Sequence, residues 1–206
     1  MHPGAESRTS GFGLPGFHRN IARGRMKPAT IQAAMRIVIG LGGNLDDTES
    51  AISGALAALA DEGRVEKVSR IWRTRPVGPE QPDYTNAAAL VEWPADPRRL
   101  LTRCQEIEAA AGRDRSREER WGPRVLDLDL LLAEFVVCRG SRLVLPHPRF
   151  HKRRFALEPA AEVVPHWIHP IEGLSLAQLA ESSRLNEADS ILGATDFDPS
   201  QSLPLG

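Results

Sequence analysis

The sequence has few cysteines, few aromatic residues and no long apolar run. Its two cysteines, Cys104 and Cys138, lie far apart and outside any C-x-x-C spacing, which favours reduced thiols in a cytoplasmic protein. No apolar stretch approaches the roughly 20 residues that a membrane-spanning helix needs. The formal net charge of −1 argues against a dedicated nucleic-acid-binding protein, which is usually basic. Any positively charged site must therefore be local.

The composition predicts one folded domain between two irregular ends. With 206 residues the chain is long enough to bury a substantial core. Residues 1–34 hold five basic residues and one acidic residue without a hydrophobic period, which predicts a disordered extension. An organelle transit peptide is the alternative. From residue 186 to residue 206 the chain turns polar, and we expect a flexible tail. The domain is therefore expected over residues 35–185.

The hydrophobic periods follow the order β-α-β-β-α-β. Runs typical of strands occupy residues 36–41, 65–73, 84–93 and 125–132, and helical spacing occupies residues 48–62 and 97–111. A hairpin is predicted at residues 134–142, and short helices at residues 155–161 and 176–182. This order predicts an α+β, ferredoxin-like fold, in which helices pack on the faces of a largely antiparallel sheet.

The most informative stretch is WGPRVLDLDLLL, residues 121–132. Because side chains alternate along a strand, Asp127 and Asp129 are expected on one face and four leucines on the other. Those leucines are Leu126, Leu128, Leu130 and Leu132. The leucine face suits a core. The two carboxylates need a positive partner. Two arginine salt bridges are the usual explanation of such a pair. The alternative is a Mg²⁺ site that also holds phosphate oxygens.

Five arginines lie directly before the aspartates: Arg113, Arg115, Arg117, Arg120 and Arg124. A charge run of this kind usually forms a solvated surface. Its position before two carboxylates favours phosphoryl transfer instead, because metal ions and arginine forks together neutralise a transferred phosphoryl group.

Other candidates are weaker, and each has an ordinary structural explanation. Tyr84, the only tyrosine, is either a core ring or a stacking platform for a flat ligand. Glu108 is either a boundary acid or an acceptor for a polar ligand. His147 precedes a proline, which is usually structural, but it could bond a phosphate beside Arg142 and Arg153.

Four blocks of the sequence resemble the 6-hydroxymethyl-7,8-dihydropterin pyrophosphokinase family of folate biosynthesis. They occur in the family's order and spacing over about residues 36 to 170. The blocks are IGLGGN (39–44), SRIWRTRPVGP with QPDYTN (69–86), IEAAAGR with RWGPRVLDLDLLL (107–132) and LPHPRFHKRRFAL-P (145–159). The WGPR-x-LDLD block is the most specific, and the four are decisive together.

The resemblance implies transfer of the β,γ-pyrophosphoryl group of ATP to the hydroxymethyl oxygen of 6-hydroxymethyl-7,8-dihydropterin, with release of AMP. It implies two Mg²⁺ ions held by Asp127 and Asp129. The catalytic residues would be Arg113, Arg124, Asp127 and Asp129. The pterin would contact Thr74, Val77, Tyr84, Asn86, Trp121 and Phe155. ATP would contact Glu108, Arg115, Trp121, Arg124, Arg142, His147 and Arg153.

The sequence departs from the family pattern at a few positions. Gly43 replaces the usual serine, Arg75 a common proline and Val125 a threonine. The loop from Arg113 to Trp121 is slightly longer, which leaves the matching of its middle arginines open. None of these departures removes a metal ligand or a stacking ring.

Two other functions fit parts of the pattern. A different Mg²⁺-dependent nucleotidyltransferase or phosphohydrolase could use the same D-x-D. A nucleic-acid-binding module on a ferredoxin-like sheet could stack bases on the aromatic residues. The net charge of −1 and the two central acids weigh against the second. We therefore expect a monomeric cytoplasmic enzyme with small-molecule substrates and neither nucleic-acid nor membrane partners.

Overall fold

The computed structural model describes residues 34–45, 47–76, 80–113, 122–185 and 191–195. Its main feature is a six-stranded sheet with the order β5-β1-β4-β3-β8, in which β2 also pairs with β4. The strands are β1 (Met35–Gly43), β2 (Arg64–Val68), β3 (Ile71–Thr74), β4 (Tyr84–Trp93), β5 (Asp127–Ala133) and β8 (Ile191–Thr195). Every pairing in this sheet is antiparallel, so the predicted α+β, ferredoxin-like fold is confirmed.

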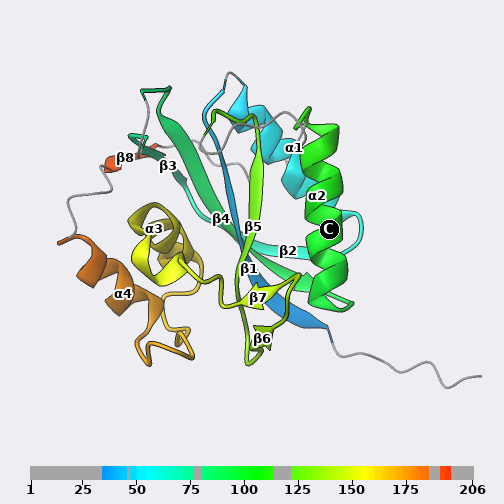
Figure 1. Ribbon diagram of the computed structural model, residues 1–206, viewed down its shortest axis with the longest axis vertical. Helices are drawn as coiled ribbons and strands as arrows, with labels where there is room; N and C mark the ends of the chain where they lie inside the picture. The colour runs from blue at the N-terminus through cyan, green and yellow to red at the C-terminus, as the bar shows by residue number, and fades with distance from the viewer. Residues whose placement is uncertain (1–33, 46, 77–79, 114–121, 186–190, 196–206) are drawn as a thin grey trace, which may run out of the picture. The chain divides into compact units, whose positions relative to one another are not determined.

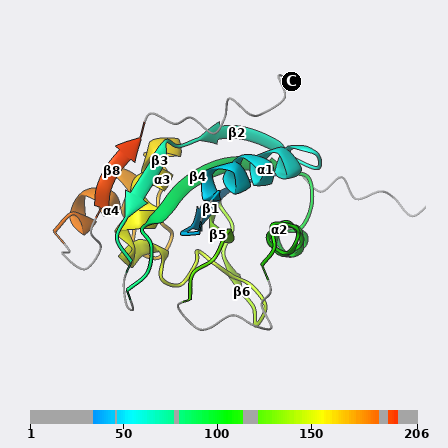
Figure 2. The same cartoon turned by 90° about the horizontal axis from the view of Figure 1, so that it is seen from above.

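Helices cover both faces of the sheet (Figures 1 and 2). On one face lie α1 (Thr48–Ala60) and α2 (Pro97–Ala110), and on the other lie α3 (Arg154–Val163) and α4 (Leu176–Ser183). The 3₁₀ helix η1 (Phe150–Lys152) leads into α3. None of the helices in the described part of the chain has the length and hydropathy required to cross a bilayer.

Alternation along the central strands produces two separate cores. Ile37 and Ile39 of β1 belong to the core beneath α1 and α2, whereas Val38 belongs to the core beneath α3 and α4. On β4, Ala89 and Leu90 divide in the same way. Burial of these side chains contributes about 25 cal/mol per Å² of apolar surface, which makes both cores principal sources of stability.

Local signals fix the helix ends near the predicted positions. Asp96 caps α2 by accepting a hydrogen bond from the Arg98 N–H, and Pro97 occupies the first turn. After α2 the chain turns at Gly112, whose φ of 92° lies in the left-handed region that glycine tolerates.

The strand predicted over residues 65–73 is split into β2 and β3. Ser69 causes the break: its hydroxyl accepts from the Ala88 N–H, while its own N–H donates to the Ala88 carbonyl. A side chain thus replaces one rung of the ladder. The two short strands then pair with different stretches of β4, residues 89–92 for β2 and residues 84–86 for β3.

The predicted leucine face of β5 is correct up to Leu130 and wrong at Leu132. The β1–β5 register pairs Val38 with Leu132 but Ile39 with Leu130, so Leu131 is an extra, bulged residue. Leu131 and Leu132 therefore both belong to the core beneath α3 and α4. A side chain at Gly40 would press on Leu131, at 3.1 Å from its methyl carbon, so glycine makes room for the bulge.

Two further segments refine the predictions. The hairpin predicted at residues 134–142 forms between β6 (Cys138–Arg139) and β7 (Val144–Leu145), with Gly140 at its turn. Residues 191–195 fall in the stretch for which the sequence predicted a flexible tail, and they form β8 instead. Edge pairing with β3 supplies the backbone hydrogen bonds that the polar sequence did not indicate.

Candidate functional site

Asp127 and Asp129 share one face of β5 with a row of very small neighbours. The register places Gly42 opposite Asp127 and Gly40 opposite Asp129. On the next strand, Asn86 pairs with Gly42 and Ala88 pairs with Gly40. Directly paired residues point to the same side of a sheet. The two carboxylates thus lie beside a floor made of Gly40, Gly42, Ala88 and Asn86. We call the carboxylates and this floor together the site face.

Asp127 is held by two arginines. The Arg113 guanidinium donates from one Nη1 atom both to Asp127 Oδ1 and to Glu108 Oε1, the latter at 2.7 Å. Arg124 Nη1 donates to Asp127 Oδ2 at 3.2 Å. The Arg113 side chain is only 7% exposed, so this contact is screened little by solvent. Asp127 therefore satisfies the salt-bridge explanation.

Glu108 is buried, and the structure gives it a supporting position. Its Oε1 accepts from the Leu128 N–H at 2.8 Å as well as from Arg113. The carboxylate therefore joins α2 to β5 and orients Arg113 toward Asp127. Glu108 was predicted to contact ATP. This geometry instead supports an indirect role, in which Glu108 orients Arg113.

Asp129 is in a different electrostatic environment from Asp127. Burial, followed by the negative charge of Asp127, raises the pKa of Asp129 to about 6, although Arg153, Arg113 and Arg124 oppose the shift. No described residue donates a hydrogen bond to its carboxylate. A nearby divalent cation would stabilise the ionised form. The residues present therefore fit Mg²⁺, which takes oxygen ligands and commonly uses one or two carboxylates.

His147 is kept neutral near the aspartates. Burial, followed by the positive charges of Arg153 and Arg149, lowers the pKa of His147 to about 4, although the charge of Asp127 opposes the shift. Its Nδ1 accepts from the Arg149 N–H at 3.3 Å, which leaves Nε2 as the protonated donor. The His147 N–H donates to the Leu131 carbonyl and ties this turn to β5. A neutral donor of this kind suits a phosphate oxygen.

The predicted pterin residues lie along β4, β3 and the start of α3. Asn86 Nδ2 donates to Thr74 Oγ1 at 3.0 Å, and this bond orients the amide. Its Oδ1 then lies over the floor, since a Cβ added at Gly42 would meet it at 2.9 Å. Tyr84 is half-buried at the start of β4. Phe155 is half-buried in the first turn of α3, with the Arg153 guanidinium 5.5 Å from its ring centroid.

The structure does not bring every predicted residue together. Arg142 lies exposed in the turn between β6 and β7 and makes no ion pair with either aspartate. Val77, Arg115 and Trp121 lie outside the described residues, as do the loop arginines Arg117 and Arg120.

The sequence analysis missed three contributors to the site. Gly40 and Gly42 stand at alternating positions of β1, and that spacing could have indicated a bare floor. Asn44 was named only as the last residue of the block IGLGGN. Its side chain is buried and contacts two other segments, which nothing in its neighbouring sequence reveals.

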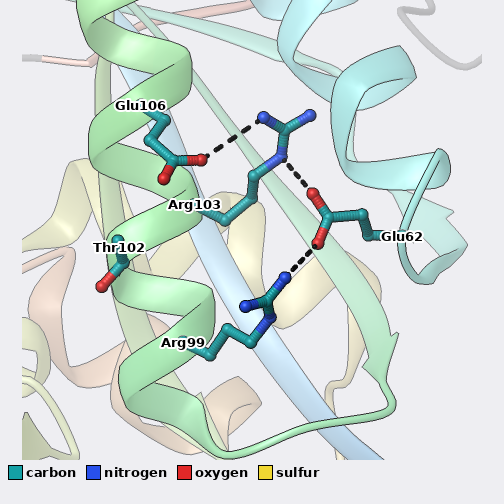
Figure 3. A pocket seen from close by; sticks show the side chains of 5 residues that line it. All are labelled: Glu62, Arg99, Thr102, Arg103 and Glu106. Carbon is teal, nitrogen blue, oxygen red and sulfur yellow. Dashed lines mark hydrogen bonds and ion pairs between the residues drawn. The ribbon is translucent and has the colours of Figure 1, made fainter.

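A shallow cavity of about 50 Å³ lies elsewhere, between α2 and the end of α1 (Figure 3). It is lined by Glu62, Arg99, Thr102, Arg103 and Glu106. Arg103 Nε lies 3.0 Å from Glu62 Oε1, and Arg99 Nη2 lies 3.4 Å from Glu62 Oε2. Its charges are thus matched internally, and it includes none of the predicted site residues.

Comparisons with known proteins concern the family and the fold. The model of the family 7,8-dihydro-6-hydroxymethylpterin-pyrophosphokinase (HPPK) matches residues 38–165. The 2-amino-4-hydroxy-6-hydroxymethyldihydropteridine pyrophosphokinase of Synechocystis sp. is 40% identical over 146 residues, 70% of this chain and 74% of that protein. The enzyme of the same name from Pseudomonas aeruginosa is 35% identical over 162 residues, 77% of this chain and 98% of that protein.

Solved structures show the same fold. The wild-type HPPK-DHPS of Plasmodium falciparum superposes with a TM-score of 0.57 at 12% identity and covers 76% of this chain. This chain spans about half of that protein, 47% of its length. The family match and the identities to curated relatives carry the assignment beyond the fold. The chain belongs to the 7,8-dihydro-6-hydroxymethylpterin-pyrophosphokinase (HPPK) family.

Proposed function

We propose that the site face is where this chain carries out the reaction of its family. As a member, the enzyme transfers a pyrophosphoryl group from ATP to hydroxymethyldihydropterin in folate biosynthesis. In this proposal the pterin hydroxymethyl oxygen attacks the β-phosphorus of ATP, the bond from the β-phosphorus to the α-phosphate oxygen breaks, AMP leaves, and the hydroxyl proton is released. The observation that carries the placement is the pair Asp127 and Asp129 beside a floor of glycines, next to two arginines.

Two Mg²⁺ ions would be held by Asp127 and Asp129. The raised pKa of Asp129 supports this assignment, because a carboxylate that ionises reluctantly gains most from a bound cation. The described residues contain no cluster of three or more metal-ligating side chains. Phosphate oxygens and water would therefore complete the coordination, as is usual for Mg²⁺. Bound there, the ions would supply neutralisation of the triphosphate charge.

Arg113 and Arg124 would stabilise the charge that spreads over the transferred group. Both guanidiniums already lie at Asp127, one on each carboxylate oxygen. The Nε2 of His147 and the guanidinium of Arg153 would bind further phosphate oxygens. Arg115, Trp121 and Arg142 complete the proposed ATP contacts.

The pterin would lie against β4, with Tyr84 and Phe155 as its stacking rings and Asn86 reading its edge. The Asn86 amide is already oriented by Thr74, and its Oδ1 acceptor suits the N–H donors of a pterin. Val77 and Trp121 are proposed as further pterin contacts.

The test is release of AMP from ATP by the purified chain, measured with and without 6-hydroxymethyl-7,8-dihydropterin. We expect AMP only when the pterin is present, in a one-to-one ratio to the pyrophosphorylated product. Equal turnover of ATP without the pterin would favour another nucleotidyltransferase or a phosphohydrolase. Full activity of Asp129→Ala at saturating Mg²⁺ would refute the metal assignment.

We further propose that the folded domain acts as a cytoplasmic monomer. Both cysteines are unpaired, as a reducing compartment would require. Size-exclusion chromatography with light scattering tests the monomer, and a dimer at micromolar concentration would contradict it.

A further inference from the structure

Asn44 is a buried residue that joins two segments of the site. It directly follows β1 and is 4% exposed. Its Oδ1 accepts from the Arg124 N–H at 2.8 Å, and its own N–H donates to the Arg124 carbonyl at 2.9 Å. On the other side its Nδ2 donates to Gln81 Oε1 at 2.9 Å and to the Pro82 carbonyl at 3.2 Å. The Asn44 amide thus forms hydrogen bonds both to the segment before β5, at Arg124, and to the segment before β4, at Gln81 and Pro82.

The hydrogen bonds continue on both sides toward the two proposed substrates. Gln81 Oε1 also accepts from the Tyr84 hydroxyl at 3.3 Å. Arg124 in turn donates to Asp127 at 3.2 Å. A connected line therefore runs from the tyrosine proposed for the pterin to the arginine proposed for ATP, and Asn44 is its midpoint.

The chemistry of this position requires asparagine. On one short side chain the site needs an acceptor toward Arg124 and two donors, toward Gln81 and the Pro82 carbonyl. An amide offers this set, whereas a hydroxyl has a single donor. The backbone must also approach closely, since a Cβ at the neighbouring Gly43 would collide with the Val125 carbonyl oxygen. Glycine at position 43, where the family pattern has serine, therefore lets Arg124 and Val125, just before β5, lie directly against the end of β1 and Asn44.

We propose that Asn44 is a positioning residue that fixes Arg124 and, through Gln81, Tyr84 relative to each other. This proposal rests on the assignment of Arg124 to ATP and Tyr84 to the pterin. Loss of the amide leaves the part-buried N–H of Arg124 and the carbonyl of Pro82 without this partner. Both loops would then shift, and binding of both substrates would weaken together.

The test compares Asn44→Ala, Gln81→Ala, the double variant and Ser69→Ala. Ser69 is a matched control, because it is a buried polar residue that also bonds backbone groups of the sheet but lies outside the line of hydrogen bonds from Tyr84 to Arg124. Steady-state AMP release gives kcat and the KM for each substrate. Thermal unfolding reports the fold.

For Gln81→Ala we expect the KM for the pterin to rise about three- to tenfold, and the KM for ATP to change less than about twofold. Asn44→Ala should raise both KM values and lower kcat by about tenfold or more. The double variant should bind the pterin no worse than Asn44→Ala. Ser69→Ala should lower the Tm and leave both KM values unchanged.

The proposal is overturned if Asn44→Ala lowers the Tm without moving either KM, as a purely structural residue would. It is also overturned if the effects of Asn44→Ala and Gln81→Ala on the pterin KM multiply, because independent sites are additive in free energy. If Asn44→Ala does not fold, an unchanged pterin KM in Gln81→Ala contradicts the proposal alone. Absence of pterin-dependent AMP release by the wild type would instead refute the proposed function.

Discussion

The two faces of β5 have different roles: one packs into the core and the other carries the two aspartates of the proposed site. Leu126, Leu128 and Leu130 lie in the core beneath α1 and α2 and bury almost all of their surface. Asp127 and Asp129 alternate with them and face a floor without large side chains. The first face stabilises the fold. The second buries Asp129 and sets it beside the negative charge of Asp127, which together raise the pKa of Asp129 and lower the free energy of unfolding at neutral pH. Within one strand, the leucine face therefore increases the stability of the fold, and the aspartate face decreases it where the reaction needs two carboxylates.

The sharpest test of this contrast is Asp129→Asn. We expect kcat to fall about a hundred- to a thousandfold, because the cation loses a charged ligand. The Tm at pH 7.5 should rise by roughly 2 to 5 °C, since an ionised carboxylate that the fold disfavours is removed. The stabilising effect of protonating Asp129 is fully present below pH 3.8 and is lost as the pH rises through about 6. The advantage of Asn should accordingly vanish near pH 4. A lowered Tm at pH 7.5 would contradict the contrast.

On the opposite face, Leu128→Ala should do the reverse. We expect a loss of about 2 to 5 kcal/mol in the free energy of unfolding, because a buried leucine leaves a cavity. Urea denaturation measures this loss. The folded fraction should keep both KM values within about twofold. A selective rise in the KM for ATP would show that the leucine face also shapes the site.

The bare floor is tested by Gly42→Ala. The added methyl group would lie 2.9 Å from Asn86 Oδ1 and should displace the amide, so we expect the KM for the pterin to rise about tenfold. Gly54→Ala is the matched control, since Gly54 lies in α1 with no atom near its added Cβ. That control should stabilise the enzyme by about 0.5 to 1 kcal/mol with unchanged kinetics. An equal KM for the pterin in the two variants would show that a methyl group at position 42 is compatible with pterin binding.

The smallest expected effect is on acid stability. Burial lowers the pKa of His147 to about 4, and burial with the charge of His151 lowers the pKa of His169, while Glu172 opposes this shift. Both imidazoles take up protons near pH 6.5 in the unfolded chain but not in the folded one. Stability should therefore fall as the pH decreases from 6.5 toward 4, by at most about 1.4 kcal/mol per pH unit for each group.

His169→Gln should flatten this decline. Glutamine can still accept from the Glu172 N–H, as His169 Nδ1 does, but it does not titrate. Tm values measured from pH 7 to pH 4 give the slope, after subtraction of the opposite contribution of Asp129 with the Asp129→Asn variant. An unchanged slope would show that His169 is not a source of the acid sensitivity.

Local sequence predicted much of this fold. Asp96-Pro97 fixed the start of α2, and the alternation of Tyr84 to Trp93 predicted both faces of β4. Each of these signals lies within one element. The D-x-D pattern likewise placed both carboxylates on one face, because the strand period is two.

What could not be predicted depends on contacts between distant segments. The bulge at Leu131 is visible only in the register with β1, and it reverses the orientation of Leu132. The division of β2 from β3 depends on a bond from Ser69 to Ala88. Asn44 reaches Gln81 and Arg124, which lie 37 and 80 residues away. No local pattern encodes such partners.

The central claim is that the aspartate face of β5 binds a cation and a triphosphate, while the leucine face supports the fold. The most direct measurement is the Tm of the wild type, Asp129→Asn and Leu128→Ala, each with and without Mg²⁺ and a non-hydrolysable ATP analogue. At about a hundredfold excess over Kd, the ligand should raise the Tm by about 5 to 10 °C in the wild type. The same shift should occur in Leu128→Ala, from a lower starting Tm, and it should be lost in Asp129→Asn. An equal shift in all three proteins would contradict the account.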